Sequence, residues 1–532
     1  DSATGVLAFE WSPQGDAIAY TAWNATPAAV TARRATGNDV VVAGEGRPKA
    51  RLWLQELDGS GAEALTPPHL HVAAFAWSPA GNQLAVQASA ASDADSDLMR
   101  RDLWLQPADG RAPRELAPTP GKLGAMAWSP DGRFLAYLGA TAANDPLAQS
   151  VLVVPATGGE PRNLTPGFEG SAADVAWLDN EHVAFVAAEG TRTMLNRVRA
   201  AGGPIERIAG GGAEVFGAAS FDARARTFAV AASTARHPAA VFAGHVGSGR
   251  LRCLVDPDPW LDTVALGRQE TIAWQSSDGL RIEGVVVYPV GYAGGTRYPL
   301  AILPHGGPEG ISQDGWTTSA LYPAQVLAGR GYVVLMPNYR GSGGRGVAFS
   351  QGDHRDLGGL EFDDVLAGID ALAARGVVDP ARVGISGTSY GGYLSAWAAT
   401  RHGGRFRAAI PFAGIANWTS FTYTTDIPEE MSVAHWDLWC DEHAELCWER
   451  SPVAHVNGAS TPTLIGHGLA DERVHPAQSL ELFTALRLEG VPVELVHYPR
   501  EPHGLLERAH QRDYMERIVR WMDRYLKERE AS

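Results

Sequence analysis

Cysteine is scarce in this sequence, with three residues in 532, at positions 253, 440 and 447. That scarcity excludes a small fold built on disulfides. Cys440 and Cys447 are close enough in sequence to pair in an oxidising compartment, and two free thiols in a reducing compartment are the alternative. The sequence implies no metal ion and no organic cofactor.

Long apolar runs and positive charge are also in short supply. No stretch approaches the roughly 18 apolar residues that span a bilayer, so membrane insertion is not expected. Lys and Arg number 44 against 60 Asp and Glu, for a net charge of −16. An acidic surface repels phosphate backbones and anionic lipid, which argues against nucleic acid as a partner. The same charge keeps an ordinary soluble enzyme dispersed, and a homo-oligomer stays open.

The chain begins at Asp1 without an initiator methionine or a recognisable signal peptide. We therefore expect an N-terminal segment to have been removed or left out, and the compartment stays open between cytoplasm and periplasm. A chain of this length exceeds one ordinary core, so at least two domains are expected.

The first half of the chain repeats itself. A Trp-Ser-Pro turn between two short apolar strands recurs roughly every 45–65 residues, and weaker copies follow it. Strand, Pro/Gly turn and strand, followed by a second strand pair, make about four strands per unit, as in a propeller blade. We predict a β-propeller over residues 1–265 with at least five blades, an incomplete N-terminus and an insertion around residues 36–49. The repeats start at Trp11, Trp77, Trp128, Trp177 and Phe221.

The pattern changes after Trp260, where apolar strands begin to alternate with helical segments. Residues 360–375 and 508–527 have the periodicity of amphipathic helices, whereas the first 265 residues show no helical run. Alternation at this spacing predicts a mostly parallel sheet covered by helices on both faces. We therefore predict an α/β-hydrolase domain over residues 266–532.

Ser389 is the predicted nucleophile. It lies in Gly387-Thr388-Ser389-Tyr390-Gly391, between a predicted strand and a predicted helix. This is the setting of a nucleophile elbow, in which glycines permit a strained turn that lifts the serine hydroxyl above the sheet. The bare motif is weak in a chain with 60 glycines, and its strand-turn-helix context carries the prediction.

A serine hydroxyl needs a base to take its proton, and the base needs a carboxylate to orient it. Asp471 and His503 follow two later predicted strands, in the chain order Ser, acid, His that this fold uses. We predict that Asp471 orients His503 and that His503 is the general base and acid. Glu472, His467 and His497 are weaker candidates, because a histidine within a strand is more often a packed core residue.

The oxyanion hole is expected from the backbone N–H of Tyr390 together with that of Gly307, with Gly306 as the alternative. Gly306 and Gly307 lie in His305-Gly306-Gly307-Pro308, directly after a predicted strand. Such a loop brings backbone donors close to a developing oxyanion. A simple Gly-Pro turn is the other interpretation, and the accompanying triad favours the catalytic one.

Together these motifs resemble the catalytic domain of the prolyl oligopeptidase family, and most of all its acylaminoacyl-peptidase branch. The resemblance covers residues 280–530 at motif level, and the predicted propeller matches the architecture that the family places over its active site. The motifs that carry it are His305-Gly306-Gly307-Pro308, Pro337-Asn338-Tyr339-Arg340-Gly341-Ser342, Gly387-Thr388-Ser389-Tyr390-Gly391, Asp471-Glu472-Arg473-Val474 and Glu501-Pro502-His503-Gly504.

The resemblance implies a serine peptidase that cleaves short peptides or acyl-peptides through an acyl-enzyme, as an exopeptidase or an oligopeptidase. Dipeptidyl peptidases of the family bind the substrate amine with paired glutamates of the propeller region. Here the only such pair is Glu429-Glu430, in the hydrolase half, which argues against a dipeptidyl activity without excluding it.

Other functions stay open alongside these. A carboxypeptidase, a non-peptide esterase or amidase, and a propeller binding module with an inactive hydrolase are the alternatives. Arg33-Arg34 and Arg100-Arg101 either anchor a substrate carboxylate or lie on solvated blade loops.

Overall fold

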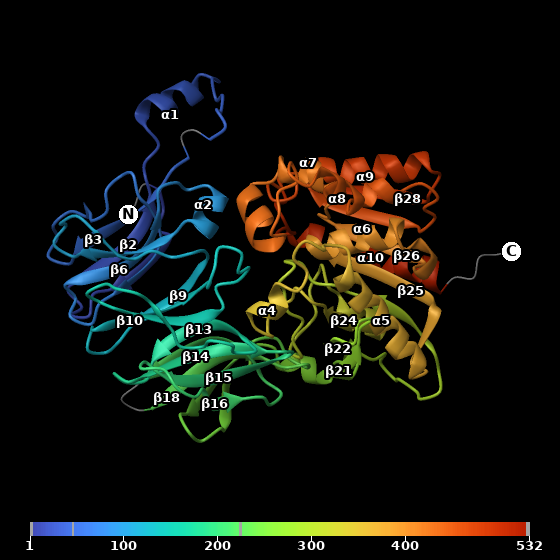
Figure 1. Ribbon diagram of the computed structural model, residues 1–532, viewed down its shortest axis with the longest axis horizontal. Coiled ribbons are helices and arrows are strands. Elements are labelled where there is room, and N and C mark those ends of the chain that lie inside the picture. Colours follow the sequence, from blue (N-terminus) through green and yellow to red (C-terminus); the bar gives the residue numbers. More distant parts are fainter. Residues whose placement is uncertain (1–3, 45–46, 223–225, 528–532) are drawn as a thin grey trace.

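The computed structural model describes residues 4–44, 47–222 and 226–527, and Figure 1 shows two parts side by side. The part coloured blue to green is built of antiparallel sheets, and the part coloured from yellow-green to red consists of one large sheet with helices. This is the predicted combination of a β-propeller with an α/β-hydrolase domain. The first three residues of the chain lie outside the described ranges.

The propeller part consists, in the described residues, of five antiparallel four-stranded sheets in chain order. Each sheet is one blade, and each of the five repeat positions lies in a different blade. The strands are β1 (Ala8–Trp11), β2 (Ala17–Trp23), β3 (Ala50–Glu56) and β4 (Glu63–Ala64); β5 (His71–Trp77), β6 (Gln83–Ser89), β7 (Asp102–Pro107) and β8 (Arg114–Ala117); β9 (Leu123–Trp128), β10 (Phe134–Gly139), β11 (Ser150–Pro155) and β12 (Arg162–Asn163); β13 (Ser171–Trp177), β14 (His182–Glu189), β15 (Arg192–Arg199) and β16 (Glu206–Gly210); β17 (Val215–Asp222), β18 (Thr227–Ser233), β19 (Ala240–His245) and β20 (Leu251–Val255).

The repeated tryptophan connects neighbouring blades. The indole N–H of Trp128 donates to the carbonyl of Ala76 (3.1 Å), and that of Trp177 donates to the carbonyl of Ala127 (3.0 Å). In both cases the acceptor precedes the tryptophan of the previous repeat, so these two tryptophans link the third and fourth blades to the blades before them. The indole N–H of Trp77 is buried without a partner. Trp11 of the first described blade is 55% exposed.

Two short α-helices interrupt the propeller part, where the sequence predicted no helical run. Helix α1 (Ala28–Ala35) lies in the excursion between β2 and β3 and projects from the blade (Figure 1). It is alanine-rich, which favours a helix even though no residue of it is buried. Helix α2 (Ala94–Met99) begins with Asp93, whose side chain accepts the N–H of Ser96. Both stretches are too short to show a helical period in the sequence.

The hydrolase part is built on one eight-stranded sheet with the order β21-β22-β24-β23-β25-β26-β27-β28. Strand β22 pairs antiparallel with both β21 and β24. Every later neighbouring pair in this order, from β24-β23 to β27-β28, is parallel. The propeller strands end at residue 255 and this sheet begins at residue 269, while the boundary at 265/266 stays a prediction. The strands are β21 (Gln269–Gln275), β22 (Arg281–Val287), β23 (Tyr298–Ile302), β24 (Val333–Asn338), β25 (Val378–Thr388), β26 (Ala408–Phe412), β27 (Thr463–Gly468) and β28 (Val493–Tyr498).

Helices cover both faces of this sheet, as predicted. Helices α5 (Leu360–Ala374), α6 (Tyr390–Thr400) and α9 (Ala477–Leu488) pack into two apolar clusters on one face. Helices α3 (Ala324–Gly329) and α10 (Arg508–Leu526) pack into the cluster on the other. The shorter helical elements are α4 (Val347–Ser350), α7 (Trp418–Thr422), α8 (Ala444–Glu449), the 3₁₀ turns η1 (Pro259–Thr263), η2 (Gly403–Arg405) and η4 (Pro452–His455), and the π-helix η3 (Glu430–His435).

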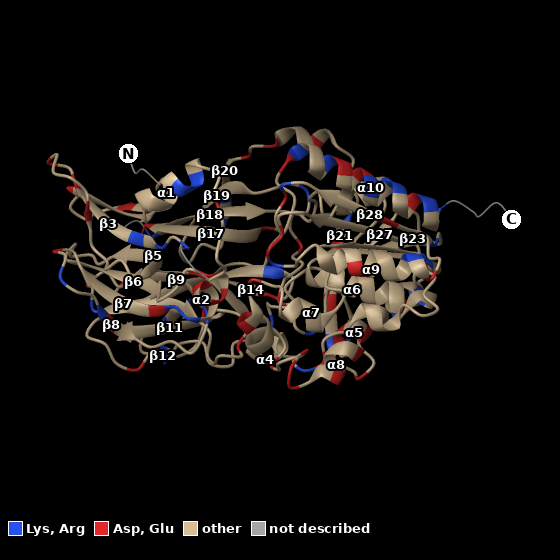
Figure 2. Ribbon diagram, turned by 90° about the horizontal axis from the view of Figure 1, so that it is seen from above, with Lys and Arg blue, Asp and Glu red and all other residues tan. Residues whose placement is uncertain are grey.

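Helix α10 shows why an amphipathic pattern predicted it correctly. Tyr514, Ile518 and Trp521 are buried against the sheet. Its outer face carries acidic and basic side chains in alternation (Figure 2), with ion pairs four residues apart such as Arg512–Glu516 and Arg517–Asp513. No helix in the described ranges combines the length and apolar character needed to cross a membrane.

The two parts meet along a polar seam. The N–H of Gly190 in the propeller donates to the carbonyl of Gly344 (2.7 Å), and the N–H of Gly344 donates to the hydroxyl of Ser171 (2.7 Å). Gln149 donates to the hydroxyl of Ser350 (2.9 Å), with both side chains buried. Because these buried donors and acceptors satisfy one another across the seam, separating the two parts would leave them unpaired.

The tryptophan link gives a prediction about stability. Replacing Trp177 by Phe keeps an aromatic ring but leaves the carbonyl of Ala127 without its donor, so the free energy of unfolding should fall by about 1–2 kcal/mol. Urea denaturation measures the change. The matched control is Trp11→Phe, whose exposed ring should make the variant differ by less than about 0.5 kcal/mol. Equal losses in the two variants would contradict the blade-linking role.

Candidate active site

Ser389 occupies the turn between β25 and α6, near the middle of the eight-stranded sheet. Its φ of 62° and ψ of −122° lie in a region that non-glycine residues rarely adopt. Its N–H donates to the carbonyl of Phe412 (2.9 Å) at the end of β26, which fixes the turn to the neighbouring strand. The predicted nucleophile therefore sits in a strained strand-to-helix elbow.

The glycines of this motif are required by close backbone approach. A Cβ atom on Gly387 would lie 2.4 Å from the carbonyl oxygen of Gly391, and one on Gly391 would lie 2.2 Å from that of Pro304. Because real Cβ contacts are never that short, only glycine fits at either position. The elbow is therefore wedged between its own helix and the loop that follows β23.

Asp471 lies in the loop after β27 and is 3% exposed. Its Oδ1 accepts the N–H groups of Arg473 (2.9 Å) and Val474 (3.0 Å), and its Oδ2 accepts the Nδ1–H of His503 (2.7 Å). Burial acts to raise the pKa of Asp471, but hydrogen bonds from His467, His503 and the backbone outweigh it and hold the pKa well below its usual range. The carboxylate therefore stays charged and orients the imidazole.

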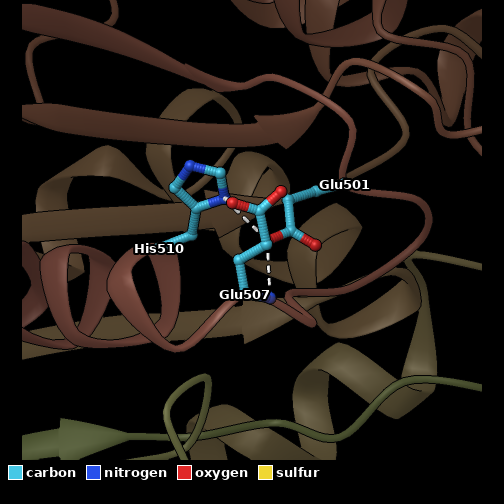
Figure 3. A group of neighbouring side chains, drawn as sticks. All are labelled: Glu501, Glu507 and His510. Atoms are coloured by element: carbon cyan, nitrogen blue, oxygen red, sulfur yellow. Dashed lines mark hydrogen bonds and ion pairs between the residues drawn. The ribbon is translucent and has the colours of Figure 1, made fainter.

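His503 lies in the loop between β28 and α10, and Glu501 holds that loop in place. The buried carboxylate of Glu501 accepts the N–H groups of Leu506 (2.7 Å) and Glu507 (2.9 Å) and the Nδ1–H of His510 (2.7 Å), as Figure 3 shows in part. The ligand atoms of Glu501, Glu507 and His510 lie within 4.8 Å of one another, a spacing that a metal ion could use. Since amides and an imidazole already engage both oxygens of Glu501, we assign the group to holding the loop of His503.

The weaker candidates for acid and base lie elsewhere. Glu472 and His497 are exposed. His467 is fully buried, with Nδ1 2.5 Å from the hydroxyl of Ser479 and Nε2 2.7 Å from the carbonyl of Val474. Its Nε2 also lies 3.3 Å from Oδ2 of Asp471, so His467 is a second imidazole beside the acid rather than a base beside Ser389.

Gly307 and Tyr390 line one cavity together with Ser389 and His503. Tyr390 is the first residue of α6, where a backbone N–H has no acceptor within its own helix. Its phenol is buried and donates to Oε1 of Glu361 (2.7 Å). Gly306 does not line this cavity, and a Cβ placed on it would lie 3.2 Å from that of Ser389. The geometry favours Gly307 over Gly306 as the second donor.

The side chains of Tyr339 and His305, which had no predicted role, stabilise residues 305–310, here called the oxyanion loop. The phenol of Tyr339 donates to the carbonyl of His305 (2.7 Å), and Nε2 of His305 lies 2.9 Å from the hydroxyl of Ser342. Burial lowers the pKa of His305 to about 4, so its imidazole is neutral at pH 7. Both residues belong to motifs visible in the sequence, but their contact became visible only in the fold.

The rest of the cavity is mostly apolar and has a volume of about 270 Å³. Its apolar side chains come from the loop after β26, from α7, from the segment before η3, from η3 itself and from the loop after β27. They are Ile415, Phe421, Ile427, Met431 and Val474. Such a pocket beside the nucleophile suits an apolar side chain of an acyl group.

The cavity wall also carries charge that the sequence analysis did not assign to a site. Glu430 and His435 line the cavity from η3 and are buried, and Arg473 lines it from the loop after β27 and pairs with Asp426 (2.6 Å). Glu430 forms an ion pair with Lys122 of the propeller, and Nε2 of His435 lies 3.3 Å from its Oε1. The neighbouring Glu429 pairs with Arg100, while Arg101 pairs with Asp97. Arg100 and Arg101 therefore have protein partners, and Arg33 and Arg34 lie on the exposed α1.

The question of the cysteines is answered by a disulfide between Cys440 and Cys447, with Cα atoms 5.8 Å apart. Both residues are buried in the cluster that packs behind the cavity. Cys253 is free and exposed in β20.

Comparison with known proteins identifies the hydrolase part. The model of the prolyl oligopeptidase family matches residues 316–529. This chain contains a prolyl oligopeptidase family domain. The predicted nucleophile, acid and base all lie inside the matched residues, and the loop of Gly307 lies just before them.

Relatives of the prolyl oligopeptidase family domain span both parts of the chain. The uncharacterized peptidase YuxL of Bacillus subtilis is 35% identical over 263 residues, which are 48% of this chain and 39% of YuxL. Dipeptidyl-peptidase 5 of Porphyromonas gingivalis is 26% identical over 484 residues, 88% of this chain and 69% of that protein. The acylaminoacyl peptidase of Pyrococcus horikoshii shares the fold, with a TM-score of 0.81 and 21% identity over 100% of this chain and 83% of that one.

The hydrogen bond between Asp471 and His503 gives a prediction about rate. Asp471→Asn should lower kcat for a p-nitrophenyl ester by about 10⁴-fold, because the amide favours the wrong imidazole tautomer. The matched control is Glu472→Gln, next in the chain and exposed, which should stay within about twofold of the wild type. Steady-state kinetics of the two variants show whether Asp471 or Glu472 is the carboxylate that orients His503. A larger loss in the Glu472 variant would contradict the assignment of the acid.

Proposed function

We propose that the protein is a serine peptidase that cleaves short peptides with a blocked N-terminus after an apolar residue, in the manner of an acylaminoacyl peptidase. The observation that carries the proposal is the cavity in which Ser389, His503 and Gly307 meet an apolar wall. No single one of these residues would support it alone.

The chemistry follows from the roles of these residues. His503, oriented by Asp471, takes the proton of the Ser389 hydroxyl as its oxygen attacks the carbonyl carbon. The N–H groups of Gly307 and Tyr390 stabilise the oxyanion of the tetrahedral intermediate. His503 then donates the proton to the leaving amine, which departs and leaves an acyl-enzyme. Water, activated by the same imidazole, hydrolyses the acyl-enzyme and regenerates Ser389.

The charge of the cavity wall favours a neutral acyl end over a free amine. Glu430 is the carboxylate of the cavity wall that could bind a substrate ammonium. Lys122 and His435 already pair with it. Burial acts to raise the pKa of Glu430, yet His435 and Lys122 hold it well below its usual range. A substrate ammonium would have to displace one of these cations inside a buried site, at a cost in desolvation.

A dipeptidyl peptidase is the second candidate, and several relatives named dipeptidyl-peptidase 5 favour it. Dipeptidyl-peptidase 5 matches 88% of this chain, including the propeller part. The two candidates differ in a single chemical group, the free or blocked amine of the substrate.

A matched pair of substrates separates the candidates. We expect kcat/KM for N-acetyl-Ala-Phe p-nitroanilide to exceed that for Ala-Phe p-nitroanilide by at least tenfold, because only the free dipeptide buries an ammonium. Replacing Phe by Asp in the blocked substrate should lower kcat/KM at least a hundredfold, since the carboxylate would lie among apolar side chains and the cations of the cavity, His435 and Arg473, already pair with Glu309 and Asp426. The reverse order for the first pair would establish the dipeptidyl activity instead, and hydrolysis of simple esters alone would contradict both.

The propeller suggests a limit on substrate size. Its residues Lys122, Asp95 and Arg100 contact the segment that forms the cavity wall, and we expect a substrate to reach Ser389 between the two parts. As a further arm of the same experiment, the blocked sequence embedded in a disordered protein should be cleaved at least tenfold more slowly than the free peptide. Equal kcat/KM values would contradict a size limit.

A further inference from the structure

A buried chain of alternating charges joins the propeller to the oxyanion loop. It runs from Lys122, just before β9, through Glu430 and His435 of η3 to Glu309, two residues after Gly307. All four side chains are nearly buried. Their exposed fractions are 12% for Lys122, 6% for Glu430, 8% for His435 and 3% for Glu309. None of these four groups belongs to the predicted triad. Because they are buried, they are not ordinary surface ion pairs, which contribute little.

The imidazole of His435 lies between two carboxylates. Its Nδ1 is 2.7 Å from Oε1 of Glu309, and its Nε2 is 3.3 Å from Oε1 of Glu430. An ionised carboxylate only accepts hydrogen bonds, so Nδ1 must carry a proton to donate to Glu309, and the carboxylate of Glu430 within ion-pair distance favours a second proton on Nε2. The geometry therefore favours an imidazolium.

The π-helix explains how one short segment presents both charges. The N–H of Trp436 donates to the carbonyl of Met431, five residues earlier, in place of the usual four. In an α-helix, positions five apart point about 140° away from each other. The wider turn brings Glu430 and His435 to one side, and such turns are frequent at functional sites.

Glu309 transmits this contact to the oxyanion hole. It lies on the tight turn in which the N–H of Gly310 donates to the carbonyl of Gly306 (3.1 Å). A Cβ on Gly307 would lie 2.2 Å from the backbone nitrogen of Glu309, so the turn at Gly307 is tight and only glycine fits there. Because Glu309 belongs to this turn, a contact that fixes its side chain also restrains the backbone that carries the Gly307 N–H.

We propose that His435 is a positioning residue for the oxyanion hole. Clamped between Glu309 and Glu430, its imidazolium holds the loop of Gly307 where the backbone N–H meets the developing oxyanion. Lys122 extends the clamp to the propeller, so that a docked propeller is part of a competent active site. This role rests on the proposed serine hydrolysis at the same site.

The clamp should make the reaction sensitive to alkaline pH. Four charged or titratable groups face His435: Glu309 on the oxyanion loop, Glu430 on its own element, Lys122 of the propeller, and His354, whose Nε2 lies 3.1 Å from the carbonyl of Ala434. Burial and Lys122 act to lower the pKa of His435, while the two carboxylates outweigh them and raise it to about 9. The imidazolium is present below that pH and is lost as the pH rises through it, so kcat should fall with a midpoint near 9.

The test compares kcat, KM and pH profiles for wild type, His435→Gln, His435→Lys and His354→Gln on a blocked p-nitroanilide. We expect H435Q to lower kcat at least tenfold at pH 7 with KM within about threefold, since only transition-state stabilisation is lost. H435Q should also lack the alkaline fall. H435K keeps a cation and should recover kcat at least threefold over H435Q. H354Q touches the same π-helix without reaching Glu309, and should stay within about twofold of wild type.

Each other outcome overturns the role. If the wild type is active and H435Q matches it, or keeps the fall near pH 9, the clamp does not position the oxyanion hole. If H354Q loses as much as H435Q, the effect comes from a loosened π-helix. An inactive wild type would overturn the proposed function itself, before any variant is compared. Should thermal unfolding show that H435Q does not fold, Glu309→Gln carries the same expectation for kcat, and an unchanged kcat there refutes the clamp.

Discussion

The strand-to-helix turn at Ser389 is the constraint on which the rest of the site depends. A non-glycine residue in this conformation costs about 1–3 kcal/mol, so the surrounding structure must hold it. Gly387 and Gly391 let the loop after β23 and the first turn of α6 pack within direct backbone contact of the turn. The same backbone contact places the oxyanion loop beside Ser389. The packing that holds the strained turn therefore also assembles the active site.

The parallel strands then determine where the remaining groups lie. Asp471 follows β27, His503 follows β28, and Gly307 follows β23, so all three come from the carboxyl ends of strands near β25. Each of these loops is held by its own hydrogen bonds or ion pairs. Backbone amides hold the carboxylate of Asp471, and the carboxylate of Glu501 holds the loop of His503. The oxyanion loop is held by Tyr339 and, in our proposal, by the charged chain that ends at Lys122.

Much of this could be predicted from the sequence, because the signals are local. The tryptophan repeats indicate the blades, since each repeat forms one strand pair, and Trp128 and Trp177 also donate hydrogen bonds to the previous blade. Ser389, Asp471 and His503 were assigned from short motifs next to predicted strands, and the structure brings Asp471 and His503 into hydrogen bond and places Ser389 and His503 in one cavity. The two helices before residue 265 gave no periodic signal, because α1 and α2 are short and depend on local alanine content and an aspartate cap.

The parts that the sequence analysis missed depend on contacts between distant segments. The Glu429-Glu430 pair was visible, but its partners Arg100 and Lys122 lie in the other part of the chain, and no local pattern connects them. His435 gave no signal because an α-helical reading places it on a different side from Glu430. The disulfide stayed open because spacing alone does not reveal whether two cysteines approach each other.

The central claim is that Ser389 is the activated nucleophile of this chain. Intact-mass analysis after treatment with a fluorophosphonate tests it most directly, because the reagent reacts with a serine only where a base and an oxyanion hole activate it. We expect one adduct per chain, mapped by peptide sequencing to Ser389, and none in Ser389→Ala. An adduct on another residue, or equal labelling of the alanine variant, would contradict the account.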